Sequence, residues 1–388
     1  MIKKILLLLF LCATSALHAA NYLTFTAKAD SSSFGIYNVG GNDPDVQYSL
    51  DGGKTWERLK NNTLIDLPNK KKALLRGYNP QGISKTYGEN TCFVITGRIA
   101  ASGSVMSLID GKGETTVIPN DYCFYHLFSR CESLTQTPQL PATTLAKDCY
   151  GGMFVGCTSL TQAPKLPATK LADYCYSGMF TECTNLTKAP ELPATQLTKG
   201  CYFGMFWGCT SLAQAPKLPA TTLAGHCYAY MFTECTNLTK APELPARALA
   251  KNCYDRMFSG CTNLTQAPQL PAEKLATECY TEMFKGCTNL TQAPQLPAKK
   301  LATECYTEMF SGCTNLVEIN VGFTKWNEEY RFEVIEREEE HRIDGESSSS
   351  TRNWLSGVAP NGTFICPKEL PKKSGESWIP EGWKVIEN

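Results

Sequence analysis

The sequence predicts an α/β solenoid of eight repeats, preceded by a small all-β module and followed by a C-terminal cap. Cysteines occur in pairs eight positions apart, the pairs recur every 26 residues, and most intervals carry the same apolar spacing and two prolines. A period of this length, held over eight copies, is typical of stacked repeats in which each unit buries its apolar side against its neighbours. The pairs are Cys123/Cys131, Cys149/Cys157, Cys175/Cys183, Cys201/Cys209, Cys227/Cys235, Cys253/Cys261, Cys279/Cys287 and Cys305/Cys313.

The composition is that of an ordinary folded protein, because 43% of the 388 residues are hydrophobic and 19% are charged. The 37 basic and 37 acidic side chains cancel, so no overall field draws the molecule to nucleic acid or to anionic lipid. We therefore expect no nucleic-acid partner.

The first twenty residues have the layout of a secretory signal peptide (1–20). Two lysines precede an apolar run from Ile5 to Leu11, and small residues end at Ala20. Cys12 suggests a lipid anchor as a minor alternative, although Leu11 is larger than the residue that usually precedes a lipidated cysteine. No later segment is long and apolar enough to form a transmembrane helix. We expect a protein that is exported and then secreted or held at the cell surface.

Residues 21–97 alternate apolar and polar side chains between turn clusters, as in YLTFTA and NTCFVITG, which indicates a small antiparallel β-module. Within it, SLDGGKTW (Ser49–Trp56) resembles an Asp-box, the hairpin motif of sialidase-like propellers. A propeller needs several blades, and the motif occurs once. We expect Asp51 and Gly53 to shape a turn, with Trp56 in the local core.

After a connector over 98–122, the repeats occupy 123–323. In the copy CYGGMFVGCTSLTQAPKLPATKLADY and the start of the next, apolar residues are spaced by four, which predicts a helix from about Ala168 to Phe180. A short strand is expected after the second cysteine. Its proline cannot donate a ladder hydrogen bond and limits the strand to about three or four residues. The second proline suits the first turn of the next helix.

The recurring apolar positions are expected to form a continuous core through the stack. In the seventh repeat they are Cys279, Tyr280, Met283, Phe284, Cys287, Leu290, Leu296 and Leu301.

The string GCTNLTQAPQLPA followed by LATECYTEMF resembles the BspA-like leucine-rich repeats of bacterial surface proteins, over about Cys123 to Phe323. The resemblance implies a leucine-rich-repeat solenoid that is exported and binds host proteins or neighbouring cells. The chain departs from the family pattern in its 26-residue period and its inserted prolines, and the last copy, CTNLVEINVGF, is closer to the ordinary family strand.

The paired cysteines are open to several roles. Zinc needs closely spaced ligands that converge, and a catalytic thiol needs a partnered base; neither accompanies the pairs. The sequence therefore predicts no catalytic, cofactor-binding or metal-binding residue. Disulfides stay open because export is expected, but eight helical residues span about 12 Å, too far for a bridge unless the chain turns. Small buried thiols are the favoured interpretation.

Two surface features stand out from the repeats. The residue after the first proline alternates in charge over Lys165, Glu191, Lys217 and Glu243, and we expect each to pair with its neighbours.

Aromatic residues also occupy positions that are polar in most copies. Phe203 and Trp207 lie in one copy and Tyr230 in the next. These three form a candidate partner-binding patch. Scattered surface aromatics that pack on their neighbours are the simpler alternative.

The repeats end at Phe323. Residues 324–350 are strongly charged and then serine-rich, which predicts a solvated insertion. Apolar residues resume over 351–388, which we expect to cap the last repeat, with Trp354, Phe364 and Trp383 in its core.

The sequence favours an exported protein that binds a protein or glycan ligand outside the cell as a monomer and has no catalytic activity. A structural spacer is the first alternative. A glycan-active protein, suggested by the single Asp-box, is less favoured because no paired carboxylates or arginine cluster accompany the motif.

Overall fold

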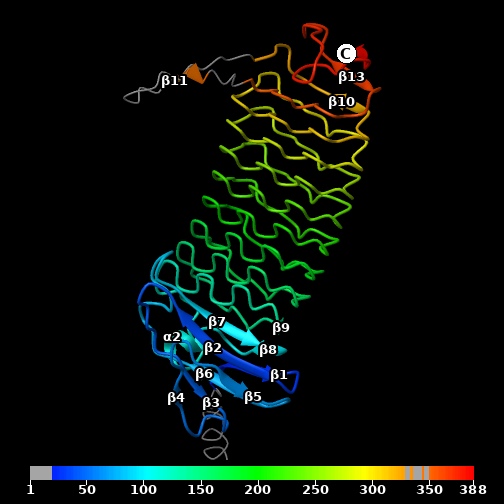
Figure 1. The fold of residues 1–388 in the computed structure, drawn as a ribbon. Coiled ribbons are helices and arrows are strands. Elements are labelled where there is room, and N and C mark those ends of the chain that lie inside the picture. The colour runs from blue at the N-terminus through cyan, green and yellow to red at the C-terminus, as the bar shows by residue number, and fades with distance from the viewer. Residues whose placement is uncertain (1–19, 328–332, 335–342, 345–348) are drawn as a thin grey trace, which may run out of the picture.

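The computed structural model describes residues 20–327, 333–334, 343–344 and 349–388. The chain runs from an N-terminal β-module through a stack of similar coils to a C-terminal sheet at the opposite end (Figure 1). The predicted signal peptide, apart from Ala20, lies outside the described residues. Most of the predicted insertion at 324–350 lies outside them as well.

Two sheets build the N-terminal module, with strand orders β4-β3-β6-β1-β8-β9 and β5-β2-β7. Phe25 packs edge-to-face against Phe34 and Phe93, with ring centroids 5.5 and 5.1 Å apart, so the two sheets share one core. The strands are β1 (Leu23–Ala27), β2 (Ser32–Asn38), β3 (Gln47–Ser49), β4 (Glu57–Arg58), β5 (Ile65–Leu67), β6 (Lys72–Arg76), β7 (Thr91–Thr96), β8 (Ile99–Ser102) and β9 (Leu134–Gln136).

The larger sheet continues into the repeats. β8 pairs in parallel with β9, which belongs to the first repeat, and Phe93 contacts Phe128 of that repeat at 5.1 Å. The short helix α2 (Ser107–Asp110) lies between these two strands in sequence. The boundary expected at residue 97 therefore falls within one sheet, because β8 and β9 lie beyond it in sequence and belong to the same sheet as β1.

The repeats are not helical, so the predicted helix at about 168–180 is wrong. In the described residues α2 is the only α-helix. Tyr174 and Gly178 have φ angles of 54° and 59°, in the left-handed region that a right-handed helix excludes. Left-handed residues recur every fourth position in this part of each repeat. The apolar spacing of four therefore comes from consecutive four-residue turns, not from the 3.6-residue period of a helix.

Backbone amides in these turns alternate between two kinds of acceptor. Gly151 N donates to Asp148 O of its own turn (3.0 Å), whereas Gly152 N donates to Ser177 O in the next repeat (2.8 Å). The same alternation recurs from repeat to repeat. A repeat without a neighbour would leave half of these amides unpaired.

Stacked aromatic rings fill the core beside these hydrogen bonds. Seven tyrosines from Tyr150 to Tyr306 stack with centroids 5.7–6.0 Å apart. Eight phenylalanines from Phe128 to Phe310 stack at 5.5–5.8 Å. In the seventh repeat, seven of the residues expected in the core are buried, and Leu301 is partly buried and packs against them.

The cysteines of the repeats are free thiols with a specific role. Each second cysteine donates its S–H to the carbonyl of a phenylalanine, at 3.0–3.2 Å. The acceptor of Cys131 is Phe93 of the β-module, and the others lie in the preceding coil, as Phe154 does for Cys183. All eighteen cysteines in the described residues are unpaired. Burial raises the pKa of the Cys157 thiol well above its ordinary value, which keeps the donor protonated. The second cysteines could not make this contact as disulfides.

The proline-containing side of each repeat is loosely joined to its neighbours. Full strands occur only in the first repeat, as β9, and in the last, as β10 (Glu318–Asn320); elsewhere in the described repeats single bridges such as Gln162 to Lys188 connect the coils. The last repeat has no proline in this segment, and β9 ends before Pro138 and pairs with β8, which has none either. Between two proline-containing repeats the missing amide hydrogens leave only single bridges, so the short strand expected in each repeat does not form there. Two strands from the predicted insertion, β11 (Glu333–Val334) and β12 (Ile343–Asp344), pair antiparallel.

An incomplete ninth coil closes the stack. Residues 350–358, STRNWLSGV, follow the path of CYTEMFSGC in the preceding repeat: Phe310 N donates to Trp354 O at 2.9 Å, and Gly357 has a φ of 70°. Trp354 stacks on Tyr306 at 6.1 Å, which ends the tyrosine column with a larger ring.

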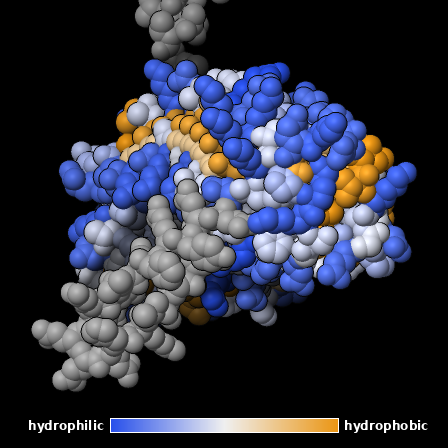
Figure 2. All heavy atoms as spheres, turned by 90° about the horizontal axis from the view of Figure 1, so that it is seen from above, coloured by the Kyte–Doolittle hydropathy of each residue, from blue (hydrophilic) through white to orange (hydrophobic). Residues whose placement is uncertain are grey.

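A small parallel sheet completes this end. β13 (Thr363–Cys366) lies between β10 and β14 (Lys384–Glu387). Trp354, Phe364 and Trp383 are all buried. Viewed from this end, the surface is mainly hydrophilic (Figure 2), as a cap over an apolar stack requires.

The glycines at left-handed positions allow a matched test of this packing. Gly200 and Gly204 both have a φ of 57°, but a Cβ at Gly200 would lie 2.2 Å from the Tyr174 ring, whereas one at Gly204 would meet nothing within 4 Å. Gly204→Ala should cost about 1 kcal/mol of unfolding free energy, from the backbone alone. Gly200→Ala should cost a further 1–3 kcal/mol or so from the clash.

Urea unfolding of the two variants measures this difference. In a double variant, Tyr174→Ala should remove the additional loss of unfolding free energy that Gly200→Ala causes. Equal losses in the two single variants would contradict the steric role of Tyr174.

Candidate binding surface

The structure brings Phe203, Trp207 and Tyr230 together into one aromatic cluster. Tyr230 lies 5.2 Å from Phe203 and 5.8 Å from Trp207, measured between ring centroids. Trp207 is 39% exposed, and the other two rings are partly exposed. The cluster is therefore an accessible apolar surface built from two successive repeats.

The four-residue turns explain why these residues meet. The side chains two, three, six and seven positions after the first cysteine form a surface that we call the turn face. Phe203 and Trp207 take the second and sixth positions of one repeat, and Tyr230 takes the third position of the next. Between them Gly204 is buried, and a Cβ there would meet no atom within 4 Å.

A chain of polar contacts extends from the cluster along the turn face. Arg256 lies over the Tyr230 ring, 5.2 Å from its centroid, and donates hydrogen bonds to the Tyr230 hydroxyl and to Glu282. Lys285 then bonds Glu282 (3.1 Å) and Glu308 (2.6 Å). These contacts hold Tyr230 and Arg256 in place before any partner arrives, which lowers the entropy cost of binding.

Asp255 is buried next to this chain. Burial raises the pKa of its carboxyl group to about 7, and the negative charges of Glu282 and Glu278 add to the rise while Arg256 opposes it. Its Oδ1 has no hydrogen-bond partner. The equivalent residue is Ala229 in the preceding repeat and Thr281 in the next, so a carboxyl group is not needed for the fold here.

A second aromatic group lies on the turn face at the start of the stack, and the sequence analysis missed it. Tyr125 contacts Tyr87 and Tyr122 at 5.6 Å each and His126 at 4.3 Å. Tyr87 comes from the β-module and is 74% exposed. Because the contact joins the module to the first repeat, the repeat pattern alone could not reveal it.

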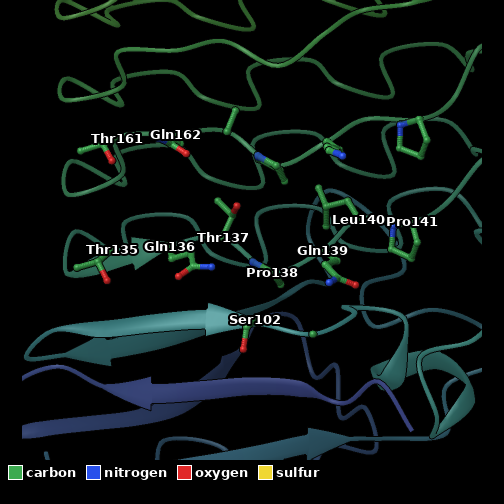
Figure 3. Close-up of a pocket in the computed structure, with 15 residues that line it drawn as sticks. Ser102, Thr135, Gln136, Thr137, Pro138, Gln139, Leu140, Pro141, Thr161 and Gln162 are labelled. Carbon is green, nitrogen blue, oxygen red and sulfur yellow. The ribbon is translucent and has the colours of Figure 1, made fainter. Parts of the chain in front are cut away.

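The other accessible surface is the proline face, which we define as the segment equivalent to Thr161–Pro167 in each repeat. Recessed cavities lie along it. One of them, of about 750 Å³, is formed by the first two repeats and the end of β8 (Figure 3). In Figure 3 the residues Thr135–Pro141 lie in a row above Ser102, and Thr161 and Gln162 begin the next row. Proline has no amide hydrogen, so fewer hydrogen bonds join neighbouring coils on this face. The space between these coils accounts for the cavities.

The alternating charges on the proline face, which we call the charged column, do not form the ion pairs expected between neighbouring repeats. Lys165, Glu191, Lys217 and Glu243 are all exposed, and none forms an ion pair in the described part of the chain. Exposed pairs gain little in water and lose side-chain entropy when they form. The four charges are therefore available to a partner.

The Asp-box segment forms the expected turn. Asp51 accepts hydrogen bonds from Lys54 N and Thr55 N, both at 3.0 Å, and from the Thr55 hydroxyl at 2.7 Å. These bonds hold the pKa of Asp51 well below its usual range, the Thr55 hydroxyl making the largest contribution. Trp56 is half-buried against Arg76, which lies 4.0 Å from its ring centroid. The carboxylate is thus engaged in shaping the turn.

Among the residues described, no three His, Cys, Asp or Glu side chains converge as a metal site would need. The same residues contain no helix with the length and apolarity needed to cross a bilayer.

Comparison with known proteins identifies the repeats. Residues 218–332 match the family model described as BspA type leucine-rich repeat region, in six copies. No curated protein and no solved structure matches the chain.

The raised pKa of Asp255 predicts a pH-dependent stability. The folded chain keeps a proton on this carboxyl group up to about pH 7, whereas the unfolded chain releases it near pH 4. Stability should therefore fall as the pH rises through this window. Asp255→Asn should raise the unfolding free energy by roughly 2–4 kcal/mol at pH 8 and by much less at pH 4.

Urea unfolding at the two pH values tests this expectation. Asp30→Asn, at an exposed position, is the control and should change neither value. An equal effect of Asp255→Asn at both pH values would contradict the assignment.

Proposed function

The chain carries BspA-type leucine-rich repeats, and from this we propose that it is an exported, non-catalytic protein whose repeats act as one solenoid that binds a partner outside the cell. The family resemblance supports export and adhesion. The eight 26-residue units supply a long surface on which single repeats can differ without disturbing the core.

The aromatic cluster is the observation that carries this proposal. Binding energy at protein interfaces concentrates in a few residues, and tryptophan, tyrosine and arginine are the most frequent among them. Trp207, Tyr230 and Arg256 lie side by side, and Arg256 is already fixed by Tyr230 and Glu282. A rigid aromatic surface of this kind suits the flat face of a sugar ring or an apolar side chain of a protein. The proposed partner is therefore a protein or glycan of the cell exterior.

The chemistry of the reactive side chains supports a role without catalysis. The repeat thiols are buried, and burial raises their pKa; Cys157 is one example. A catalytic thiol needs the opposite, a lowered pKa and access to substrate. Asp51, the carboxylate of the Asp-box, is committed to its own turn.

The export step can be tested directly on the full chain. We expect protein recovered from the medium, or from the surface of intact cells, to begin at or near Asn21 when its N-terminus is sequenced. A lipid-modified chain that begins at Cys12 would favour the anchored alternative. An intact N-terminus on protein found only inside the cells would contradict export.

Binding can be tested with substitutions taken from neighbouring repeats. Phe203→Ser and Trp207→Thr introduce the residues found at the same positions in the preceding copy, Ser177 and Thr181, so the fold should be kept. The purified chain is screened on arrays of matrix proteins and glycans. The double variant should bind the ligand at least about tenfold more weakly, because truncating a central aromatic residue typically costs more than ~1 kcal/mol.

Tyr78→Ser is the matched control, since Tyr78 is 71% exposed but lies in the β-module. It should bind as tightly as the unchanged chain. Equal binding by the double variant would remove the aromatic cluster from the proposed site.

A further inference from the structure

The charged column on the proline face has an unusual order. Lys165, Glu191, Lys217 and Glu243 follow one another in four successive repeats, and the equivalent residue is Gln139 before them and glutamine again after them. No ion pair of the described residues involves any of the four charges. Each of the four charges therefore lacks an ion-pair partner among the described residues.

Read along the stack, the order of the four residues is Lys, Glu, Lys, Glu. In a second copy that runs in the opposite direction, the residue opposite each of them has the opposite charge. A twofold axis that lies parallel to the segments, midway between Glu191 and Lys217, would place a second copy face to face with the first. Lys165 would then oppose Glu243 of the second copy, and Glu191 would oppose Lys217 of the second copy. All four charges meet opposite charges, and the flanking glutamines meet each other. An interface between identical chains has this reciprocal form.

The other charges on this side are compatible with the same arrangement. Across the axis, Lys188 would face Gln214 of the second copy and Arg247 would face Thr169 of the second copy. Lys240 would likewise face a glutamine. No two like charges would oppose each other over the four central repeats, so the arrangement carries no repulsion to offset the gain.

Apolar surface accompanies the charges. The second proline is exposed in the same four repeats, at Pro167, Pro193, Pro219 and Pro245, and less exposed in the repeats on either side. Cavities of about 460 and 590 Å³ lie next to these prolines. With the axis between the third and fourth repeats, the first six repeats overlap reciprocally. From strand dimensions, seven residues across six coils cover about 650 Å², somewhat less than the roughly 800 Å² that each partner of a standard interface buries.

We propose that the proline face is an interface between two antiparallel copies of this chain, set in register by the alternating column. The charges of the column alternate in sign, an order that a second copy in reverse orientation matches at all four positions, whereas a polyanion or a charged membrane would meet Glu191 and Glu243 with like charge. The proline face and the aromatic cluster are separate surfaces, so this association does not depend on the proposed function. It departs from the monomer expected from the sequence.

Sedimentation of the purified full-length mature chain tests the proposal with charge-swapped variants. Lys165→Glu/Lys217→Glu makes the column wholly acidic, and Glu191→Lys/Glu243→Lys makes it wholly basic. We expect the unchanged chain to sediment as a dimer at low salt and to dissociate as salt is added. Each variant alone should be a monomer, and an equimolar mixture of the two should restore the dimer.

Lys60→Glu/Lys85→Glu is the control, because both lysines are exposed in the β-module and the change in net charge is the same as in the acidic variant. It should leave the dimer intact. Restoration of the dimer in the mixture also shows that both variants are folded. An unchanged chain that is monomeric at every salt concentration would overturn the proposal, as would a dimer that survives in either variant alone.

Discussion

The hydrogen bonds between successive coils are the interaction on which the rest of the structure depends. In each four-residue turn, one amide bonds within the turn and the next bonds to the following coil, as Gly151 and Gly152 do. The turn can close in this way only because every fourth residue adopts a left-handed φ. No single repeat can satisfy its own backbone, so the stack forms as a unit and must be closed at both ends.

Hydrogen bonding between coils also explains how side chains pack in the core and how the two ends of the stack are closed. Coils spaced by backbone hydrogen bonds bring equivalent side chains into columns, so tyrosine stacks on tyrosine and each second cysteine reaches the phenylalanine carbonyl of the preceding coil. At the first repeat, Phe93 of the β-module supplies this carbonyl to Cys131. At the last, Trp354 occupies the place of a methionine and covers the tyrosine column. The caps thus continue the pattern of the stack with different residues.

Because the interior is uniform, differences between repeats are confined to the surface. On the turn face, substitutions in three adjacent repeats create the aromatic cluster and the polar chain through Arg256. On the proline face, missing amide donors loosen the stack and leave cavities beside unpaired charges. These two surfaces differ in chemistry, one aromatic and rigid, the other alternating in charge, so one molecule has room for a ligand and for a second copy of itself.

The sequence by itself determined the 26-residue period, the apolar column positions, and the residues Phe203, Trp207 and Tyr230 as a departure from the pattern. It also predicted a short strand ended by proline in each repeat, but in the described middle repeats single bridges take the place of that strand. It could not determine the conformation of the repeats. A spacing of four is shared by a helix face and by four-residue turns, and only hydrogen bonding between coils decides between them. That bonding also decided that the second cysteines act as thiol donors and that STRNWLSGV adds a last, incomplete coil. Stacking of the first repeat on the β-module brings Tyr87 to Tyr125. Each of these depends on segments brought together by stacking, which a periodic sequence does not encode locally.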